Sequence, residues 1–437
     1  MRNLLILMFL GLSLPAIAYQ EEAKERPNII LIMADDLGFE TLGVNGSESY
    51  KTPHLNQLAK EGMNFTQCYS TPLCTPSRVQ LMTGQYNSRN YIGFGLLDLK
   101  ERTFGHYLKE AGYDNFIAGK WQLFGNKHQR ELAGDRDGSL PSDAGLDNYC
   151  LWQVKQLGSR YKDPLLSTPS GDKIYEGKFG PDIFVDHIVD FIEKERDKPF
   201  FVYFPMALSH DPFVPTPDNE HFSSFEAKSK TNDPKYFGEM VGYMDKLLGK
   251  IFDTVHTSGN ADNTLIIFIG DNGTDQDVVS LQNGNSIKGD KGNTTTAGTH
   301  VPMIATWKGK IKAGSVNNNL IDFTDFLPTL LEVAQLPKDQ RVFSDGISFY
   351  PQLLGKRSAK RDWVFCHYAP NWGGFEHKRF IHDKSLKLYE NGSIYKIDTD
   401  PMEMHPLESG QLTGNERKKI TEFRTIMKEM NKQSKGI

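Results

Sequence analysis

Residues 28–36 read NIILIMADD, an apolar run that ends in two aspartates. Two similar runs follow along the chain, PFFVYFP at residues 199–205 and LIIFIG at residues 265–270. Short and nearly continuous apolar runs are typical of strands that are buried on both faces of a sheet. We therefore expect residues 28–34, 199–205 and 265–270 to be central strands of a largely parallel sheet.

Helical patterns lie between these strands, and they favour helices over residues 52–61, 103–111, 183–196 and 236–257. Strands that alternate with helices predict an α/β fold, here a large α/β/α sandwich with a mostly parallel mixed sheet. A polar connection follows near residue 340, and the rest of the chain has both helix and strand patterns. We expect a main domain over residues 19–340 and a smaller C-terminal α+β subdomain over residues 341–437.

The N-terminus, residues 1–18, has the pattern of a signal peptide. Residues 4–18 contain no charged side chain, and they end in Ala16-Ile17-Ala18, a small-x-small cleavage pattern. The run is short for a membrane span. The sequence therefore predicts cleavage near Ala18 and a secreted or periplasmic protein with no membrane span.

Charge and cysteine content narrow the functional classes. A formal net charge of −5 gives no footprint for nucleic acid. The chain has four cysteines. Because Cys74 has the chemical use described below, Cys68, Cys150 and Cys366 allow at most one intramolecular disulfide.

Two predicted strands end in side chains that offer oxygen ligands. Asp35 and Asp36 follow the first strand, and Asp271 and Asn272 follow the third. Functional groups gather beyond the carboxyl ends of strands in α/β sheets, and three carboxylates there would repel one another without a cation. Oxygen ligands favour Ca²⁺ or Mg²⁺ over zinc. We expect one divalent cation, Ca²⁺ in preference to Mg²⁺; the alternative is that each pair caps a following turn.

Residues 73–89, LCTPSRVQLMTGQYNSR, contain a C-x-P-x-R element from Cys74 to Arg78. This element resembles the signature of the formylglycine-dependent sulfatases, which are arylsulfatase-like members of the alkaline-phosphatase superfamily. A lone five-residue pattern recurs by chance. Here the resemblance covers essentially the whole mature chain, because further segments follow in the family's order: RPNIILIMADDLG, GKW at 119–121, SHDPF at 209–213, GDNG at 270–273, KG at 291–292 and YKIDTDPMEMHPL.

The resemblance implies a sulfuric ester hydrolase in which Cys74 is oxidised to formylglycine (3-oxoalanine) by a separate maturation enzyme. A thiol that attacked sulfur would leave a stable thiosulfate. A hydrated aldehyde can instead attack the sulfate ester with one hydroxyl and expel sulfate by ionising the other. The matured side chain would be a metal ligand together with Asp35, Asp36, Asp271 and Asn272, and the cation would polarise the sulfate oxygens.

The resemblance also assigns roles to basic side chains. Arg78 supports the ionised hydrate, Lys120 and Lys291 bind the sulfate oxygens, and His210 donates a proton to the leaving-group oxygen. The alternative for His210 is a structural bond to a loop carbonyl. One position departs from the family, since many relatives have histidine where this chain has Gln122. Glutamine can donate a hydrogen bond to the sulfate, but it cannot shuttle a proton.

Three functions stay open on the sequence alone. The first is hydrolysis of a sulfate ester on a carbohydrate or polysaccharide, a plausible substrate for an exported enzyme. The second is a phosphodiesterase or phosphonate monoester hydrolase of the same superfamily, although no further His/Asp cluster for a second cation is evident. The third is a non-catalytic glycan-binding protein, which only Gln122 favours. Six more residues could face the rest of a substrate, and none is assigned to the site: His300, Trp372, His377, Lys378, Arg379 and His382.

Overall fold

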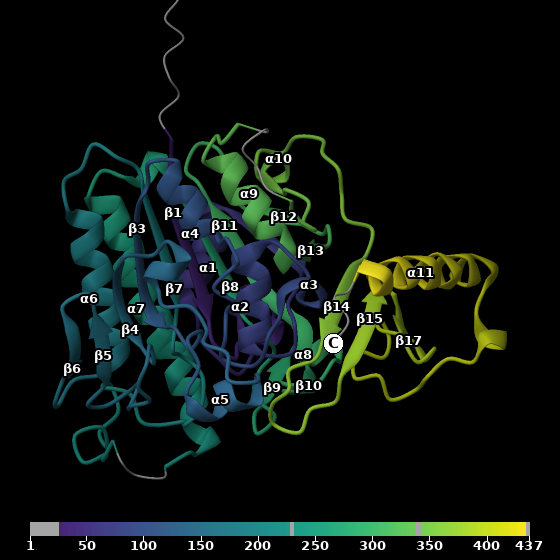
Figure 1. Ribbon diagram of the computed structural model, residues 1–437, viewed down its shortest axis with the longest axis horizontal. Coiled ribbons are helices and arrows are strands. Elements are labelled where there is room, and N and C mark those ends of the chain that lie inside the picture. Colours follow the sequence, from purple (N-terminus) through teal and green to yellow (C-terminus); the bar gives the residue numbers. More distant parts are fainter. Residues whose placement is uncertain (1–25, 228–230, 338–342, 434–437) are drawn as a thin grey trace, which may run out of the picture.

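The computed structural model describes residues 26–227, 231–337 and 343–433. Figure 1 shows a large part with one long sheet between two layers of helices, and a smaller part, coloured yellow-green to yellow, with its own sheet and helix α11 (Gly414–Gln433). This arrangement confirms the predicted α/β/α sandwich with a smaller α+β subdomain. The predicted signal peptide lies outside the described residues.

Strand β1 (Asn28–Ala34) lies at the centre of the large sheet. It pairs in parallel with β7 (Phe200–Pro205) on one side and with β8 (Thr264–Gly270) on the other. The three strands expected at the centre are therefore neighbours, and their bounds differ from the expected ones by at most one residue.

The described part of the large sheet has the order β12-β2-β11-β8-β1-β7-β3-β4-β5-β6, with β13 also beside β2. Strand β11 is antiparallel to both of its neighbours, and β4, β5 and β6 are joined antiparallel at one edge, so the sheet is mixed. A separate hairpin contains β9 (Val279–Gln282) and β10 (Asn285–Lys288). The other strands of the large sheet are β2 (Met63–Tyr69), β3 (Asp114–Lys120), β4 (Asn148–Trp152), β5 (Leu165–Thr168), β6 (Gly171–Ile174), β11 (His300–Thr306), β12 (Ser315–Asn317) and β13 (Ile321–Asp322).

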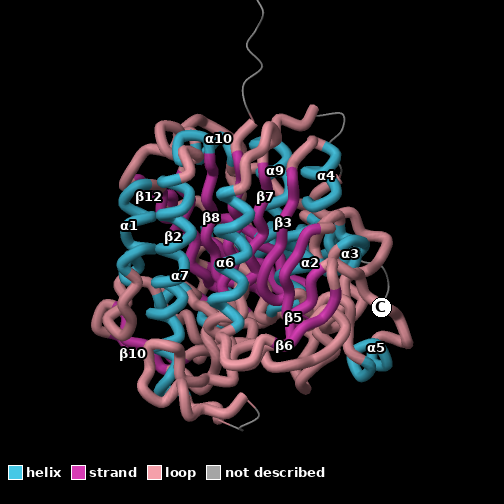
Figure 2. Tube along the Cα trace, turned by 90° about the vertical axis from the view of Figure 1, so that its left-hand side faces the viewer, coloured by secondary structure: helices cyan, strands magenta, loops and turns pink. Residues whose placement is uncertain are grey.

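The central strands are buried on both faces, as their apolar runs predict. In β1, Ile30 and Ile32 face the core under α1 (Pro53–Glu61), α6 (Gly180–Glu193) and α7 (Phe237–Thr257). Ile29 and Leu31 face the opposite core, under α2 (Cys74–Thr83), α4 (Phe104–Glu110), α9 (Phe326–Val333) and α10 (Tyr350–Leu353). Figure 2 shows α1, α6 and α7 in front of the sheet. The shorter helices are α3 (Asn87–Asn90), α5 (Lys127–Leu132) and α8 (Thr296–Thr299).

All four predicted helices are present, as α1, α4, α6 and α7. Helix α6 begins three residues before its expected start, at Gly180, because Pro181 is favourable in a first turn, and it ends at Glu193, before the extended Lys194. No helix in the described ranges is long and apolar enough to cross a membrane.

The C-terminal subdomain packs both faces of its small antiparallel sheet. Phe365 and Ile381 face α11, whereas Cys366 and Tyr368 face the loop that leads into Cys74. The domain boundary expected at residue 340 falls in an interval that is not described, and it stays a prediction. The described cysteines are all free, so the permitted disulfide does not form. The strands of this sheet are β14 (Val364–Tyr368), β15 (Lys378–His382), β16 (Leu386–Tyr389) and β17 (Ile394–Lys396).

Candidate active site

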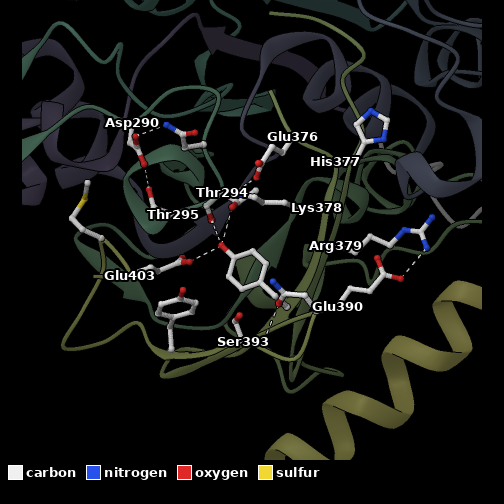
Figure 3. Close-up of a pocket in the computed structure, with 15 residues that line it drawn as sticks. Asp290, Thr294, Thr295, Glu376, His377, Lys378, Arg379, Glu390, Ser393 and Glu403 are labelled. Carbon is white, nitrogen blue, oxygen red and sulfur yellow. Dashed lines mark hydrogen bonds and ion pairs between the residues drawn. The ribbon is translucent and has the colours of Figure 1, made fainter. Parts of the chain in front are cut away.

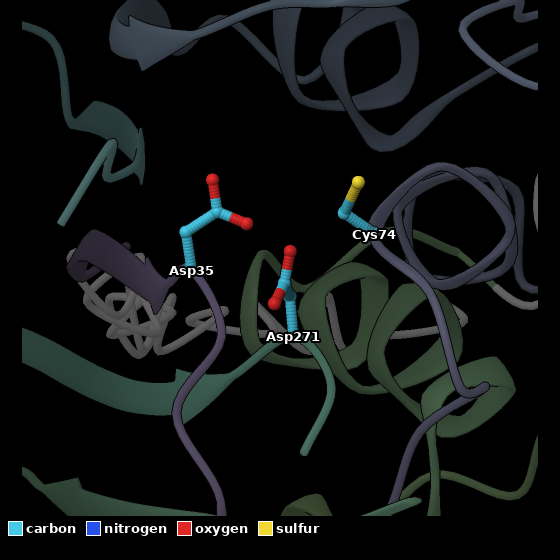
Figure 4. Close-up of side chains that lie close together, drawn as sticks. All are labelled: Asp35, Cys74 and Asp271. Atoms are coloured by element: carbon cyan, nitrogen blue, oxygen red, sulfur yellow. The ribbon is translucent and has the colours of Figure 1, made fainter. Parts of the chain in front are cut away.

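The carboxyl edge of the large sheet brings the sequence-predicted site residues together. Asp35 and Asp271 follow the paired strands β1 and β8, and Cys74 is the first residue of α2. Figure 4 shows these three side chains around a common space. One ligand atom from each lies within 4.8 Å of the other two.

The acidic side chains fit a divalent cation. Oδ1 of Asp35 and Oδ1 of Asn272 are buried and have no hydrogen-bond partner, although Asn272 Nδ2 donates to Asp36 at 2.9 Å. Burial raises the pKa of Asp271, and the neighbouring Asp35 carboxylate raises it further. The carboxylates of Asp35 and Asp271 can be ionised together only beside positive charge. These close carboxylates, and the oxygens without a hydrogen-bond partner, therefore suit an ion such as Ca²⁺ or Mg²⁺.

Two fully buried cations lie against these carboxylates. Lys120 Nζ donates to Asp35 Oδ2 at 2.8 Å. Arg78 Nη2 lies 3.3 Å from Asp271 and 3.6 Å from Asp35, and its Nη1 donates to the Lys120 carbonyl at 3.0 Å. Burial alone would raise the pKa of Asp35, but Lys120, His210 and Arg78 outweigh burial and hold it well below its usual range. Asp35 is therefore ionised at any working pH.

Cys74 lies at the amino end of α2, where helix dipoles favour negative charge. Arg78 follows one helical turn later and faces the same space, as the spacing predicts. Burial nevertheless raises the pKa of the Cys74 thiol, so the unmodified side chain is protonated at neutral pH. The Cys74 Sγ lies 4.0 Å from Gln122 Oε1, so Gln122 lies beside the side chain that would become the nucleophile.

A second group of side chains lies next to Asp36. Lys291 Nζ donates to Asp36 Oδ2 at 2.5 Å and to His210 Nε2 at 3.2 Å. Burial lowers the pKa of Lys291, but the carboxylates of Asp36 and Asp211 outweigh it and raise this pKa well above its usual range. Burial lowers the pKa of His210, and Lys291 lowers it further. Lys291 is therefore charged, whereas the pKa of His210 lies below its ordinary value.

Asp211 also contacts the site, although the sequence did not indicate it. Its Oδ1 lies 2.8 Å from His210 Nδ1 and 3.8 Å from Lys291 Nζ. Its position directly after His210 in SHDPF was an available signal, because carboxylates often orient histidines. Asp36, Asp211 and Asp275 also form an acidic cluster that the sequence did not indicate, but the Lys291 ammonium already lies against two of its members.

Two glycines explain how the loops reach the site. Gly119 has φ +117°, and a Cβ there would lie 2.0 Å from the Pro205 carbonyl oxygen, so only glycine lets β3 deliver Lys120. Gly292 has φ +86°, and its amide donates to Pro72 O at 2.8 Å, which fixes Lys291 beside the loop before Cys74.

The six residues that the sequence left unassigned lie in three different environments. His300 stacks on Phe39 and lies under Tyr69, and His382 is buried. Trp372 stacks on Phe94 in the cluster that contains Cys74. His377, Lys378 and Arg379 line a cavity of about 630 Å³ between the loop at residues 290–295 and the C-terminal sheet (Figure 3). This cavity does not contain Cys74.

Comparisons with known proteins identify the family of this chain. The family model described as Sulfatase matches residues 27–336, and the model described as N-sulphoglucosamine sulphohydrolase, C-terminal, matches residues 290–433. The chain is 31% identical over 369 residues to N-acetylgalactosamine-6-sulfatase of Mus musculus, covering 76% of this chain and 67% of that protein. It is 30% identical over 446 residues to arylsulfatase A of Homo sapiens, covering 88% and 84%. Among solved structures, Ps i-CgsB in complex with k-i-k-neocarrahexaose has a similar fold, with a TM-score of 0.76, 23% identity and 94% of both chains covered.

Proposed function

Because the chain belongs to the sulfatase family and is a sulfuric ester hydrolase, we propose that it removes sulfate from a sulfated carbohydrate or polysaccharide and that formylglycine made from Cys74 is its nucleophile. The observation that carries this proposal is the position of Cys74 at the start of α2, next to the carboxylates of Asp35 and Asp271, which Arg78 and Lys120 contact. Its buried thiol has a raised pKa, which makes it a poor nucleophile unless it is modified.

The residues of the site fit both a divalent cation and an aldehyde at position 74. Asp35, Asp36, Asp271 and Asn272 would hold a divalent cation together with the matured Cys74, and we favour Ca²⁺ because the ligand set is rich in oxygens and Ca²⁺ accepts flexible coordination. When bound, these groups supply a Lewis acid and an ionisable hydroxyl nucleophile.

Basic side chains bind and orient the sulfate in this proposal. Lys120 is held by Asp35, and Lys291 is held by Asp36 and Asp211, so both can offer a fixed ammonium to sulfate oxygens. Arg78 stabilises negative charge on the matured Cys74. Gln122, beside the Cys74 Sγ, can donate a hydrogen bond to the same group but cannot take its proton.

His210 is the proposed proton donor to the leaving-group oxygen. Its Nδ1 is held by Asp211, and its Nε2 faces Lys291 at 3.2 Å. Donation requires a proton on Nε2, which the Lys291 ammonium is close enough to supply while Asp211 holds Nδ1. We also propose that the protein acts outside the cytoplasm, on the strength of the signal-peptide pattern at residues 1–18.

Paired substrates test the proposed function. The protein is co-expressed with a formylglycine-generating enzyme and assayed with an aryl sulfate, the matching aryl phosphate and sulfated oligosaccharides, with free sulfate and phosphate as the readouts. We expect sulfate release from the aryl and sugar esters. A much higher rate on the aryl phosphate would favour the phosphodiesterase alternative, and no turnover of any ester by the matured protein would favour a glycan-binding protein.

A further inference from the structure

Arg160 is a partly exposed cation without a carboxylate partner. It lies in the connection between β4 and β5, and its guanidinium carbon is 4.0 Å from the centre of the Trp152 ring. No hydrogen bond or ion pair joins its side chain to any residue within the described ranges, and its Nη1 is buried without a partner. By contrast, the buried arginines Arg78 and Arg361 each contact an aspartate. Because the side chain as a whole is partly exposed and its other guanidinium nitrogens have no acceptor within the described ranges, Arg160 has donors left for an anionic ligand.

The fold ties the segment that carries this cation to the loop of the proposed proton donor. Trp152 ends β4 and is the register partner of Lys120 at the end of β3, so Arg160 stacks at the same carboxyl edge as the sulfate-binding residues. The next residue, Tyr161, donates hydrogen bonds from its hydroxyl to the carbonyls of Ala207 at 2.8 Å and His210 at 2.5 Å. The segment that carries Arg160 is thus tied to the His210 loop.

Electrostatics agree with this placement. Burial raises the pKa of Asp211, but its contact with His210 and the charges of Lys291 and Arg160 outweigh burial and lower it. Arg160 is therefore close enough to act on Asp211 without forming an ion pair with it. Asp211 itself is engaged by His210 at 2.8 Å, which leaves the guanidinium available for another anion.

The chemistry of this position indicates what Arg160 binds. In the proposed reaction Lys120 and Lys291 bind the scissile sulfate, and His210 protonates the oxygen of the leaving sugar. Since the segment of Arg160 is tied to the His210 loop, we assign Arg160 to the side of the leaving sugar. A guanidinium that is held flat on an aromatic ring presents a planar pair of donors, which matches a carboxylate or a sulfate. Since the whole protein carries a net charge of −5, attraction of a second anion has to come from a local cation of this kind.

We propose that Arg160 recognises a second anionic group, a carboxylate or a further sulfate, on the sugar that bears the scissile sulfate. The inference rests on the proposed function, because it assigns Arg160 to the leaving-group side of that reaction. It makes the preferred substrate a sugar with at least two negative charges.

Kinetics on matched sugars test this assignment. The substrates are a sulfated monosaccharide with no other charge, its uronic acid counterpart and its disulfated counterpart, and the variants are R160Q and R160K. Wild-type protein should prefer at least one doubly charged sugar. In R160Q that preference, as a ratio of kcat/KM values, should fall about 10- to 100-fold, mainly through KM, because a hydrogen-bonded charge contact is lost. R160K should retain part of it, and the two charged sugars distinguish a carboxylate from a sulfate partner.

Arg196 supplies the matched control. Its guanidinium lies 4.1 Å from the Phe191 ring centre and also has a buried Nη1 without a partner, but it precedes β7 at the opposite edge of the sheet. R196Q should leave the preference unchanged. A wild-type protein without preference for charged sugars, or an R160Q variant that loses activity equally on neutral and charged sugars, would overturn the assignment alone. Failure of wild-type protein on every sulfate ester would instead contradict the proposed function.

Discussion

Replacement of Lys291 by methionine should lower kcat/KM for sulfate esters by a factor of about 10²–10³. The ammonium is fixed by Asp36 at 2.5 Å and by His210 at 3.2 Å, and the side chain is only 14% exposed. Removal of one preorganised donor from a developing negative charge costs about 3–4 kcal/mol. Coulomb's law gives a similar magnitude of about 4 kcal/mol for unit charges 4 Å apart at an effective dielectric constant of 20.

The assay is steady-state hydrolysis of 4-nitrophenyl sulfate by matured, cation-loaded protein, together with thermal unfolding of each variant. K291R keeps the charge but changes its shape, so its loss should be smaller. K246M is the control, because Lys246 is an exposed lysine whose ion pair with Asp218 lies outside the candidate site. A folded K291M protein with less than about a threefold loss would refute the assignment of Lys291 to the sulfate, given the magnitude expected for such a donor.

Three further predictions concern His210, the bound cation and His382. His210→Gln should lower kcat about 10²–10⁴-fold on sugar sulfates but far less on 4-nitrophenyl sulfate, whose leaving group needs no proton; equal losses on both would contradict the role of His210. Removal of divalent cations with a chelator should abolish activity and lower the Tm. Asp271→Asn should be inactive, and chelation should lower its Tm by less than that of the wild type, because one of the crowded carboxylates is absent. Burial lowers the pKa of His382 from 6.5 to about 3, so folding stability should be full above pH 6.5 and fall as the pH drops toward 3, by about 2 kcal/mol at pH 5. Urea unfolding measures this loss as a change in the free energy of unfolding between pH 7 and pH 5, and in His382→Gln the change should be smaller by that amount. His405→Gln, at an exposed site, should behave as wild type.

The sequence predicted the centre of the fold and most of the candidate site for a simple reason. Strands that are buried on both faces read as apolar runs, and parallel neighbours bring their carboxyl ends to one edge. The positions of Asp35 and Asp271 therefore follow from the pattern alone. Cys74, Lys120 and Lys291 came from ordered motifs, since no periodicity would have marked them.

The contacts that the sequence did not predict depend on tertiary packing. Asp211 gains its importance from a loop conformation that turns its carboxylate toward His210. The position of Arg160 depends on the Trp152 ring beneath it. It also depends on the Tyr161 hydroxyl, which joins this segment to carbonyls 46 and 49 residues later in the chain. Patterns of burial and spacing carry no information on which side chains of two such loops meet.

The most direct test of the central claim is the mass of the tryptic peptide that contains Cys74, from protein made together with a formylglycine-generating enzyme. We expect a peptide about 18 Da lighter than the thiol form, as conversion of cysteine to the aldehyde nucleophile requires. An unmodified thiol that can still be alkylated, from cells in which the maturation enzyme is active on a control substrate, would contradict the assignment of Cys74 as the nucleophile.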